Sequence, residues 1–129
     1  MRFPSATEIL FLHDYLIETT GGEHGVRDLA ALQAALARPF AGFGEVELFP
    51  GLHQKVAALA DGIVNYHPFL DGNKRTGVSA AGIMLALNGG ELTAGNDELV
   101  WFGRHLAVAR PVVEEIAGWL RGHSRPSGT

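Results

Sequence analysis

The residues of this chain that could carry out chemistry together are concentrated in one segment, residues 67–76, which read HPFLDGNKRT. The segment leads into a run of small and apolar residues that predicts a buried helix over residues 73–87. The start of a helix binds anions through its free N–H groups, and two cationic side chains lie at the same place. The predicted phosphate-binding residues are Gly72, Asn73, Lys74 and Arg75.

Two further side chains flank this phosphate-binding loop. Asp71 is a hard oxygen ligand of the kind that holds Mg²⁺ beside phosphates. His67 suits general-base work, because histidine titrates near neutral pH. Structural explanations also exist, since His67 before Pro68 could end a helix and residues 71–73 could form an ordinary turn. A phosphate site, a metal ligand and a base in one loop nevertheless favour phosphoryl or nucleotidyl transfer.

Six helices are predicted to position the loop, because glycine and proline punctuate apolar residues at helical spacing. The first begins with a capping box, in which Ser5 caps the helix and Glu8 reaches back, and it ends at Gly21. Asp28 caps the second, and Pro39 stops it. The other four cover residues 52–66, residues 73–87, a stretch that begins at Asn96 or Asp97, and a stretch from Pro111 with Val112, Ile116 and Leu120 on its inner face.

Two segments depart from this helical pattern. Residues 40–51 place several aromatic residues among glycines, which predicts either a short hairpin or an irregular loop. Residues 123–129 are polar and predict a loose C-terminal tail that follows one domain over residues 1–122. The predicted fold class is an all-α bundle with one small non-helical insertion.

Composition excludes several classes of protein. The 129 residues are 47% hydrophobic and 19% charged, as in an ordinary globular domain. A net charge of −4 and only two lysines argue against nucleic-acid binding. No apolar run approaches the ~20 residues of a membrane helix, and the N-terminus lacks a signal pattern. The absence of cysteine excludes disulfides and cysteine-bound zinc. We therefore expect a soluble, cytoplasmic protein.

Residues 67–75 resemble the signature of the Fic/Doc proteins: His-Pro-Phe, an acidic residue, then Gly-Asn and a basic pair. The resemblance implies the all-α Fic fold, with residues 40–49 as a flap hairpin before the motif. Where typical Fic enzymes have Asn-Gly-Arg, this chain has Asn73-Lys74-Arg75, which resembles the Doc branch, the toxin of death-on-curing toxin–antitoxin modules. Residues 8–14 and 25–39 also resemble that branch, so the similarity covers most of residues 1–120.

The resemblance implies one of two reactions on a protein hydroxyl. Doc proteins transfer the γ-phosphate of ATP to a threonine of elongation factor EF-Tu, which inhibits translation, whereas Fic enzymes transfer AMP. Carried over, His67 would deprotonate the hydroxyl, Asp71 would hold Mg²⁺, and residues 72–75 would bind the phosphates. Lys74 fills space and adds charge there, which could block one nucleotide orientation without indicating which, and our hypothesis is the kinase reaction. A non-catalytic binding module is the third class, and the intact motif argues against it.

The same resemblance implies a separate antitoxin that binds near the active site. Residues 19–23 match an inhibitory Fic motif only by chance, because Gly21 and Gly22 would break its helix. Other features stay open. Residues 13–14 could be a phosphohydrolase metal pair, or a helix-surface or supporting pair. Residues 27–28 could shape a groove, or form a cap and a salt bridge. The aromatic residues at 40–49 could grip a target by adding a strand, or seal the core.

Overall fold

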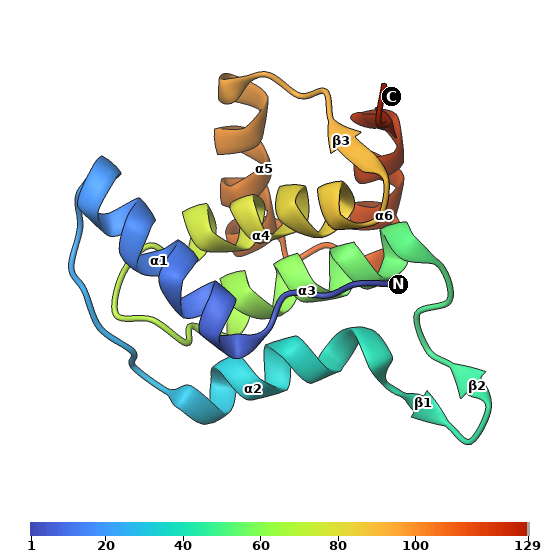
Figure 1. Cartoon of the computed structure of the whole chain (residues 1–129), viewed down its shortest axis with the longest axis horizontal. Coiled ribbons are helices and arrows are strands. Elements are labelled where there is room, and N and C mark those ends of the chain that lie inside the picture. The colour runs from blue at the N-terminus through green and yellow to red at the C-terminus, as the bar shows by residue number, and fades with distance from the viewer. Residues whose placement is uncertain (129) are drawn as a thin grey trace.

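Helices make up most of the structure, which confirms the predicted all-α fold (Figure 1). The computed structural model describes residues 1–128. Within that range no helix has both the length and the apolar character needed to cross a membrane. The helices are α1 (Ala6–Thr20), α2 (Leu29–Ala37), α3 (Leu52–Tyr66), α4 (Asn73–Leu87), α5 (Asn96–Ala109) and α6 (Val113–Gly122), with a 3-10 turn at Arg38–Phe40. Two small antiparallel sheets pair β1 (Gly42–Phe43) with β2 (Val46–Glu47), and β3 (Gly90–Leu92) with β4 (Ser124–Pro126).

Helix α3 lies at the centre of the fold and packs against α2, α4, α5 and α6. Figure 1 shows α3 and α4 side by side. A Cβ atom at Gly77 of α4 would lie 2.6 Å from Val64 Cγ2 and 3.0 Å from Ala60 O on α3, so the two helices approach closely only because this residue is glycine. The loop that joins α3 to α4, residues 67–72, is therefore anchored at both ends by a tightly packed helix pair.

The beginnings and ends of α1 and α2 follow the predicted capping chemistry. Ser5 Oγ accepts from Glu8 N at 3.1 Å, and Glu8 Oε1 accepts from Ser5 N at 2.9 Å. Gly21, with φ of +87°, ends α1. Asp28 caps α2 by accepting from Ala31 N at 3.1 Å. These local signals set where the chain turns toward the loop of residues 67–72.

The segment ahead of α3 forms a hairpin, the first of the two structures that its sequence allows. Strands β1 and β2 pair antiparallel, with Phe43 opposite Val46. A buried lysine of α3 ties down the base of the hairpin: Lys55 Nζ donates to Phe49 O at 2.7 Å and Pro39 O at 3.1 Å, and lies 2.8 Å from Glu47 Oε1. Phe43 at the tip is 85% exposed, so the hairpin projects a free aromatic side chain.

The end of the chain differs from the prediction of a loose tail over residues 123–129. Residues Ser124–Pro126 form strand β4, which pairs with β3. Backbone bonds extend the pairing, since Thr93 N donates to His123 O at 2.7 Å and Ser127 N to Gly89 O at 2.8 Å. The order comes from main-chain pairing with a distant segment, and a three-residue polar strand has no periodicity that would reveal it. Residue 129 lies outside the described residues.

The start of α6 also differs from the prediction. Pro111 precedes the helix, and Val112 is its N-cap with 73% of its surface exposed. Ile116 and Leu120 are buried as predicted. The helix begins two residues after Pro111, so Val112 lies outside the helical register that would turn it inward.

Candidate active site

The loop between α3 and α4 is held in a conformation with two left-handed residues. His67 ends α3 with φ of +52° and ψ of +57°, and Gly72 precedes α4 with φ of +79°. Phe69 between them is buried. The Asn73 side chain ties the loop to itself, because Asn73 Oδ1 accepts from Phe69 N at 3.0 Å and Asn73 Nδ2 donates to Phe69 O at 3.0 Å. Asn73 thus helps to shape the loop, and its Nδ2 lies 3.5 Å from His67 Nδ1.

A second segment, residues 25–28, runs alongside the loop and bonds to its backbone. Leu70 N donates to Gly25 O at 3.1 Å, and Arg27 N donates to Pro68 O at 2.7 Å. The Arg27 guanidinium donates to the carbonyls of His67 and Tyr66, the latter at 2.9 Å. Both carbonyls belong to the end of α3, where the last helical carbonyls have no helical partner. Arg27 therefore fixes the backbone of His67. The two residues are 40 positions apart in the sequence, so the sequence pattern did not reveal this contact.

Replacing Arg27 with alanine is expected to reduce activity more than stability. Small displacements of a reacting group cost about 10- to 100-fold in rate, whereas an exposed side chain contributes about 1 kcal/mol or less to folding. Transfer rates and urea unfolding of Arg27→Ala should be compared with those of Arg121→Ala. Arg121 of α6 lines a pocket at the other end of α3, where Leu52 lies. Equal loss of rate in both variants would contradict a positioning role for Arg27.

His13 supports the loop from inside the fold. Its ring is stacked on Phe69 with centroids 3.8 Å apart, and its Nε2 lies 2.7 Å from Asp71 O. The side chain is 2% exposed, so His13 supports the loop and does not lie on the helix surface. Within residues 1–128, no group of three His, Cys, Asp or Glu side chains could hold a metal ion by itself.

Asp71 and Arg75 lie where the loop meets the end of α1. The Asp71 carboxylate accepts from Glu23 N at 3.1 Å and from Gly72 N at 2.8 Å. These backbone donors hold the pKa of the Asp71 carboxyl below its ordinary value of 3.8, and the N–H of Glu23 has the larger effect. Arg75 donates to Gly21 O at 2.7 Å and to Thr20 Oγ1, and its Nη2 lies 3.9 Å from Asp71 Oδ1. Asp71 is therefore an ionised, half-exposed carboxylate with a cation beside it.

The predicted site residues surround a single pocket of about 330 Å³. No side chain caps the start of α4 within residues 1–128, so the first N–H groups of this helix are available to a ligand. The structure thus brings His67, Asp71 and the start of α4, with Lys74 and Arg75, together at one pocket. The pocket is lined by Val64, His67, Leu70, Asp71, Gly72, Asn73, Lys74, Arg75 and Ala107.

A second pocket of about 400 Å³ adjoins the first and shares Lys74 and Arg75 with it. Apolar residues of α1 and α5, among them Leu16, Leu99 and Val100, form its walls. Arg104 lies in the same wall, and sequence reasoning missed it because nothing local links α5 to the motif. Lys74 therefore lies where the two pockets meet, and the second pocket is the more apolar of the two.

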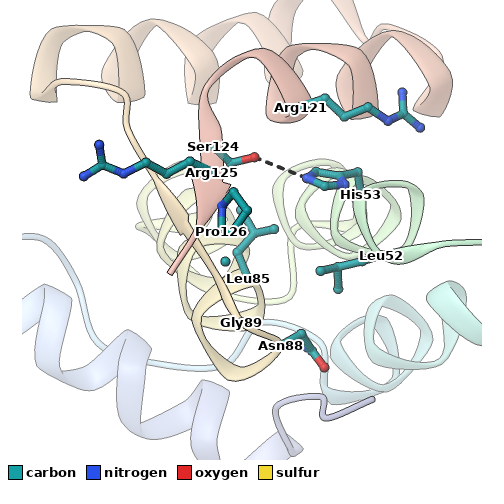
Figure 2. A pocket seen from close by; sticks show the side chains of 10 residues that line it. Leu52, His53, Leu85, Asn88, Gly89, Arg121, Ser124, Arg125 and Pro126 are labelled. Atoms are coloured by element: carbon teal, nitrogen blue, oxygen red, sulfur yellow. Dashed lines mark hydrogen bonds between the residues drawn. The ribbon is translucent and has the colours of Figure 1, made fainter. Parts of the chain in front are cut away.

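Figure 2 shows a third pocket, of about 380 Å³, that contains none of the predicted site residues. It lies at the start of α3, whereas the candidate active site lies at its end. His53 Nε2 is 3.2 Å from Ser124 Oγ, and the serine also donates to Leu120 O at 2.6 Å. Burial lowers the pKa of His53. The serine hydroxyl is used by the backbone, so this pair supports the chain end and is not arranged as a nucleophile and its base.

Comparisons with known proteins agree with this geometry. A model of the Fic/DOC family matches residues 3–85, which include the whole loop. A curated protein named Toxin Doc, from Mycolicibacterium smegmatis (strain ATCC 700084 / mc(2)155), is 46% identical over 77 residues. That alignment covers 60% of this chain and 59% of the relative, so the similarity spans about three-fifths of the relative's length. Since the family match takes in more than half of the chain, this protein belongs to the Fic/DOC family.

Proposed function

We propose that this protein is the toxin of a toxin–antitoxin module that acts in the cytoplasm. Its reaction would transfer the γ-phosphate of ATP to a protein hydroxyl, with a threonine of EF-Tu as the acceptor, and so inhibit translation. The observation that carries the proposal is the pocket shared by His67, Asp71 and the start of α4. The 46% identity to a protein named Toxin Doc supports the toxin role.

The chemistry follows from the positions of the side chains. A target hydroxyl that enters the pocket beside His67 would lose its proton to the imidazole as its oxygen attacks the γ-phosphorus. The bond from that phosphorus to the bridging oxygen breaks, and ADP leaves. The N–H groups at the start of α4, with Lys74 and Arg75, would bind the phosphate oxygens as negative charge builds up on them. Arg75 is already held in place by Thr20 and Gly21.

Asp71 fits a role as the protein ligand of Mg²⁺. Its carboxylate is ionised, about half exposed and part of the pocket lining. Mg²⁺ commonly binds one or two carboxylates, substrate phosphates and waters, so it does not need a cluster of protein ligands. When bound, the ion would neutralise charge on the transferred phosphate. Asp71 would orient it, and the Glu23 and Gly72 N–H groups would orient Asp71.

The second pocket fits the proposed antitoxin. Its apolar walls and its cationic residues Lys74, Arg75 and Arg104 match a segment that carries both apolar and acidic side chains. Such a segment would cover Lys74 and Arg75, which also line the first pocket, and so exclude ATP. The chain itself ends α1 at Gly21, so residues 19–23 form no inhibitory helix.

Transfer of AMP is the alternative reaction, and Lys74 is the residue expected to decide between the two. Its side chain lies where the two pockets meet, so it fills space that one orientation of the nucleotide would need. We expect Lys74→Gly to gain AMP transfer at the expense of γ-phosphate transfer, detected with ATP labelled at either position. Lys74→Ala is the matched control, because it also removes the charge but avoids the loss of about 1 kcal/mol of helix stability that glycine causes. A glycine variant that still moves only the γ-phosphate would show that Lys74 does not orient the nucleotide.

A reconstituted translation system tests the proposed function. Protein added with ATP should stop synthesis of a reporter, and fresh EF-Tu added after this protein has been removed should restore it. A block that fresh EF-Tu does not relieve would assign the acceptor to another component. Full synthesis in the presence of folded protein and ATP would contradict the toxin function.

A further inference from the structure

Two tryptophans form an aromatic surface between α5 and α6, away from the candidate active site. Trp101 on α5 is 50% exposed, and Trp119 on α6 is partly buried. Their ring centroids are 6.3 Å apart, with the planes tilted by 31°. Phe102 stacks on Trp119 at 4.0 Å, which fixes that ring against the core. Packing explains Trp119, but it leaves half of Trp101 in solvent.

The protein already places a nitrogen heterocycle and a carboxylate against each indole ring. His105 stacks on Trp101 at 4.6 Å, and its Nε2 lies 3.8 Å from Glu115 Oε2. His123 stacks on Trp119 at 4.0 Å, and its Nε2 lies 3.2 Å from Glu98 Oε2. An indole face with a carboxylate at its edge is an arrangement that attracts cations. The two histidines therefore show that this surface accepts planar, nitrogen-containing groups against its indole rings.

A hollow of about 330 Å³ on the same surface is lined by Asp97, Glu98, Trp101 and Trp119. Asp97 lies one helical turn before Trp101 and lines the hollow with it, whereas His105 lies one turn after Trp101 and stacks on its ring. Glu98 is used by Gly95 N and His123, whereas Asp97 has no ion pair within residues 1–128. No lysine or arginine lines the hollow. It therefore combines an aromatic wall with an Asp97 carboxylate that has no ion-pair partner within residues 1–128.

We infer that this hollow binds the side chain of an arginine presented by a protein partner. A guanidinium is planar, so it can stack on Trp101 while its N–H groups reach Asp97, and it is less strongly hydrated than an ammonium. The hollow shares no residue with either pocket at the phosphate-binding loop. A partner could thus hold α5 here without entering the active site.

The test is a titration of the full chain with three capped tripeptides, Gly-Arg-Gly, Gly-Lys-Gly and Gly-citrulline-Gly, followed by the NMR signal of the Trp101 indole N–H. The arginine peptide should give a saturable shift, the lysine peptide a weaker one, and the uncharged citrulline peptide none. A cation–π contact at an exposed site corresponds to about a two- to fivefold change in Kd. Trp101→Leu and Asp97→Asn should each weaken arginine binding by about that factor.

Glu45→Gln is the matched control, because it removes one exposed negative charge from the hairpin turn and should leave the Kd unchanged. Thermal melting of each variant separates loss of binding from loss of fold, and Asp97→Asn keeps the test valid if Trp101→Leu is unstable. Equal shifts with the citrulline or lysine peptide would overturn the assignment to a guanidinium. Unchanged binding by Asp97→Asn would overturn the site.

Discussion

His67→Ala is expected to lower the rate of group transfer by about 100- to 10,000-fold and to leave the fold intact. The side chain is exposed, and the backbone at residue 67 is held by Arg27, so alanine removes the proposed base without removing the backbone contacts that shape the loop. Since the same residue would act in either reaction, γ-phosphate and AMP transfer should both disappear. Toxicity in growing cells should disappear with them.

His53→Ala is the matched control for this variant. His53 lies at the start of α3, whereas His67 lies at its end. His53 lines the pocket that contains no predicted site residue. Transfer should proceed at the normal rate in this control. Rates and thermal melting should be measured together, and a His67→Ala protein that melts normally and still transfers at the full rate would refute the assigned base.

Phe69→Ala is expected to reduce the free energy of unfolding by about 3–5 kcal/mol. Phe69 is 1% exposed, and its ring stacks on the buried His13. Alanine would leave a cavity between the loop and α1, and His13 would lose the surface that positions it against Asp71. The substitution should therefore weaken both the core and the site.

Urea unfolding measures this effect, and Leu70→Ala provides the comparison for stability. Leu70 is the next residue along the loop but is 52% exposed, so its replacement should cost less than about 1 kcal/mol. If the two variants had the same stability, Phe69 would not be the anchor of the loop. Comparison of transfer rates well below the melting temperature would show whether loss of the Phe69 ring also impairs the site.

Sequence reasoning predicted the parts of the fold that local chemistry decides. The capping box at Ser5, the cap at Asp28 and the apolar runs of α3 and α4 are all encoded within a few residues, and the structure has each of them. The sequence pattern of residues 40–51 does not decide between a hairpin and a loop, because strands of two residues carry no periodicity, and only the family resemblance implies the hairpin. Its order comes from the buried Lys55, whose hydrogen bonds to Pro39 and Phe49 cannot be read from spacing.

The candidate site follows the same rule. The residues that would touch substrate lie within nine positions of one another, so the motif displays them together. The residues that hold the motif in place are far from it in the sequence. His13 reaches Asp71 across 58 residues, and Arg27 reaches His67 across 40. Such contacts depend on the packing of α1 and α2 against the loop, which periodicity does not specify.

The most direct measurement is the intact mass of EF-Tu after incubation with this protein, Mg²⁺ and ATP labelled at the α- or the γ-phosphate. The proposed function predicts that EF-Tu gains one phosphoryl group, that only the γ-label is transferred, and that the gain is absent with His67→Ala. A gain of one AMP carrying the α-label would contradict the kinase reaction and assign the protein to the AMP transferases. An unchanged mass, with folded protein and active EF-Tu, would contradict EF-Tu as the acceptor.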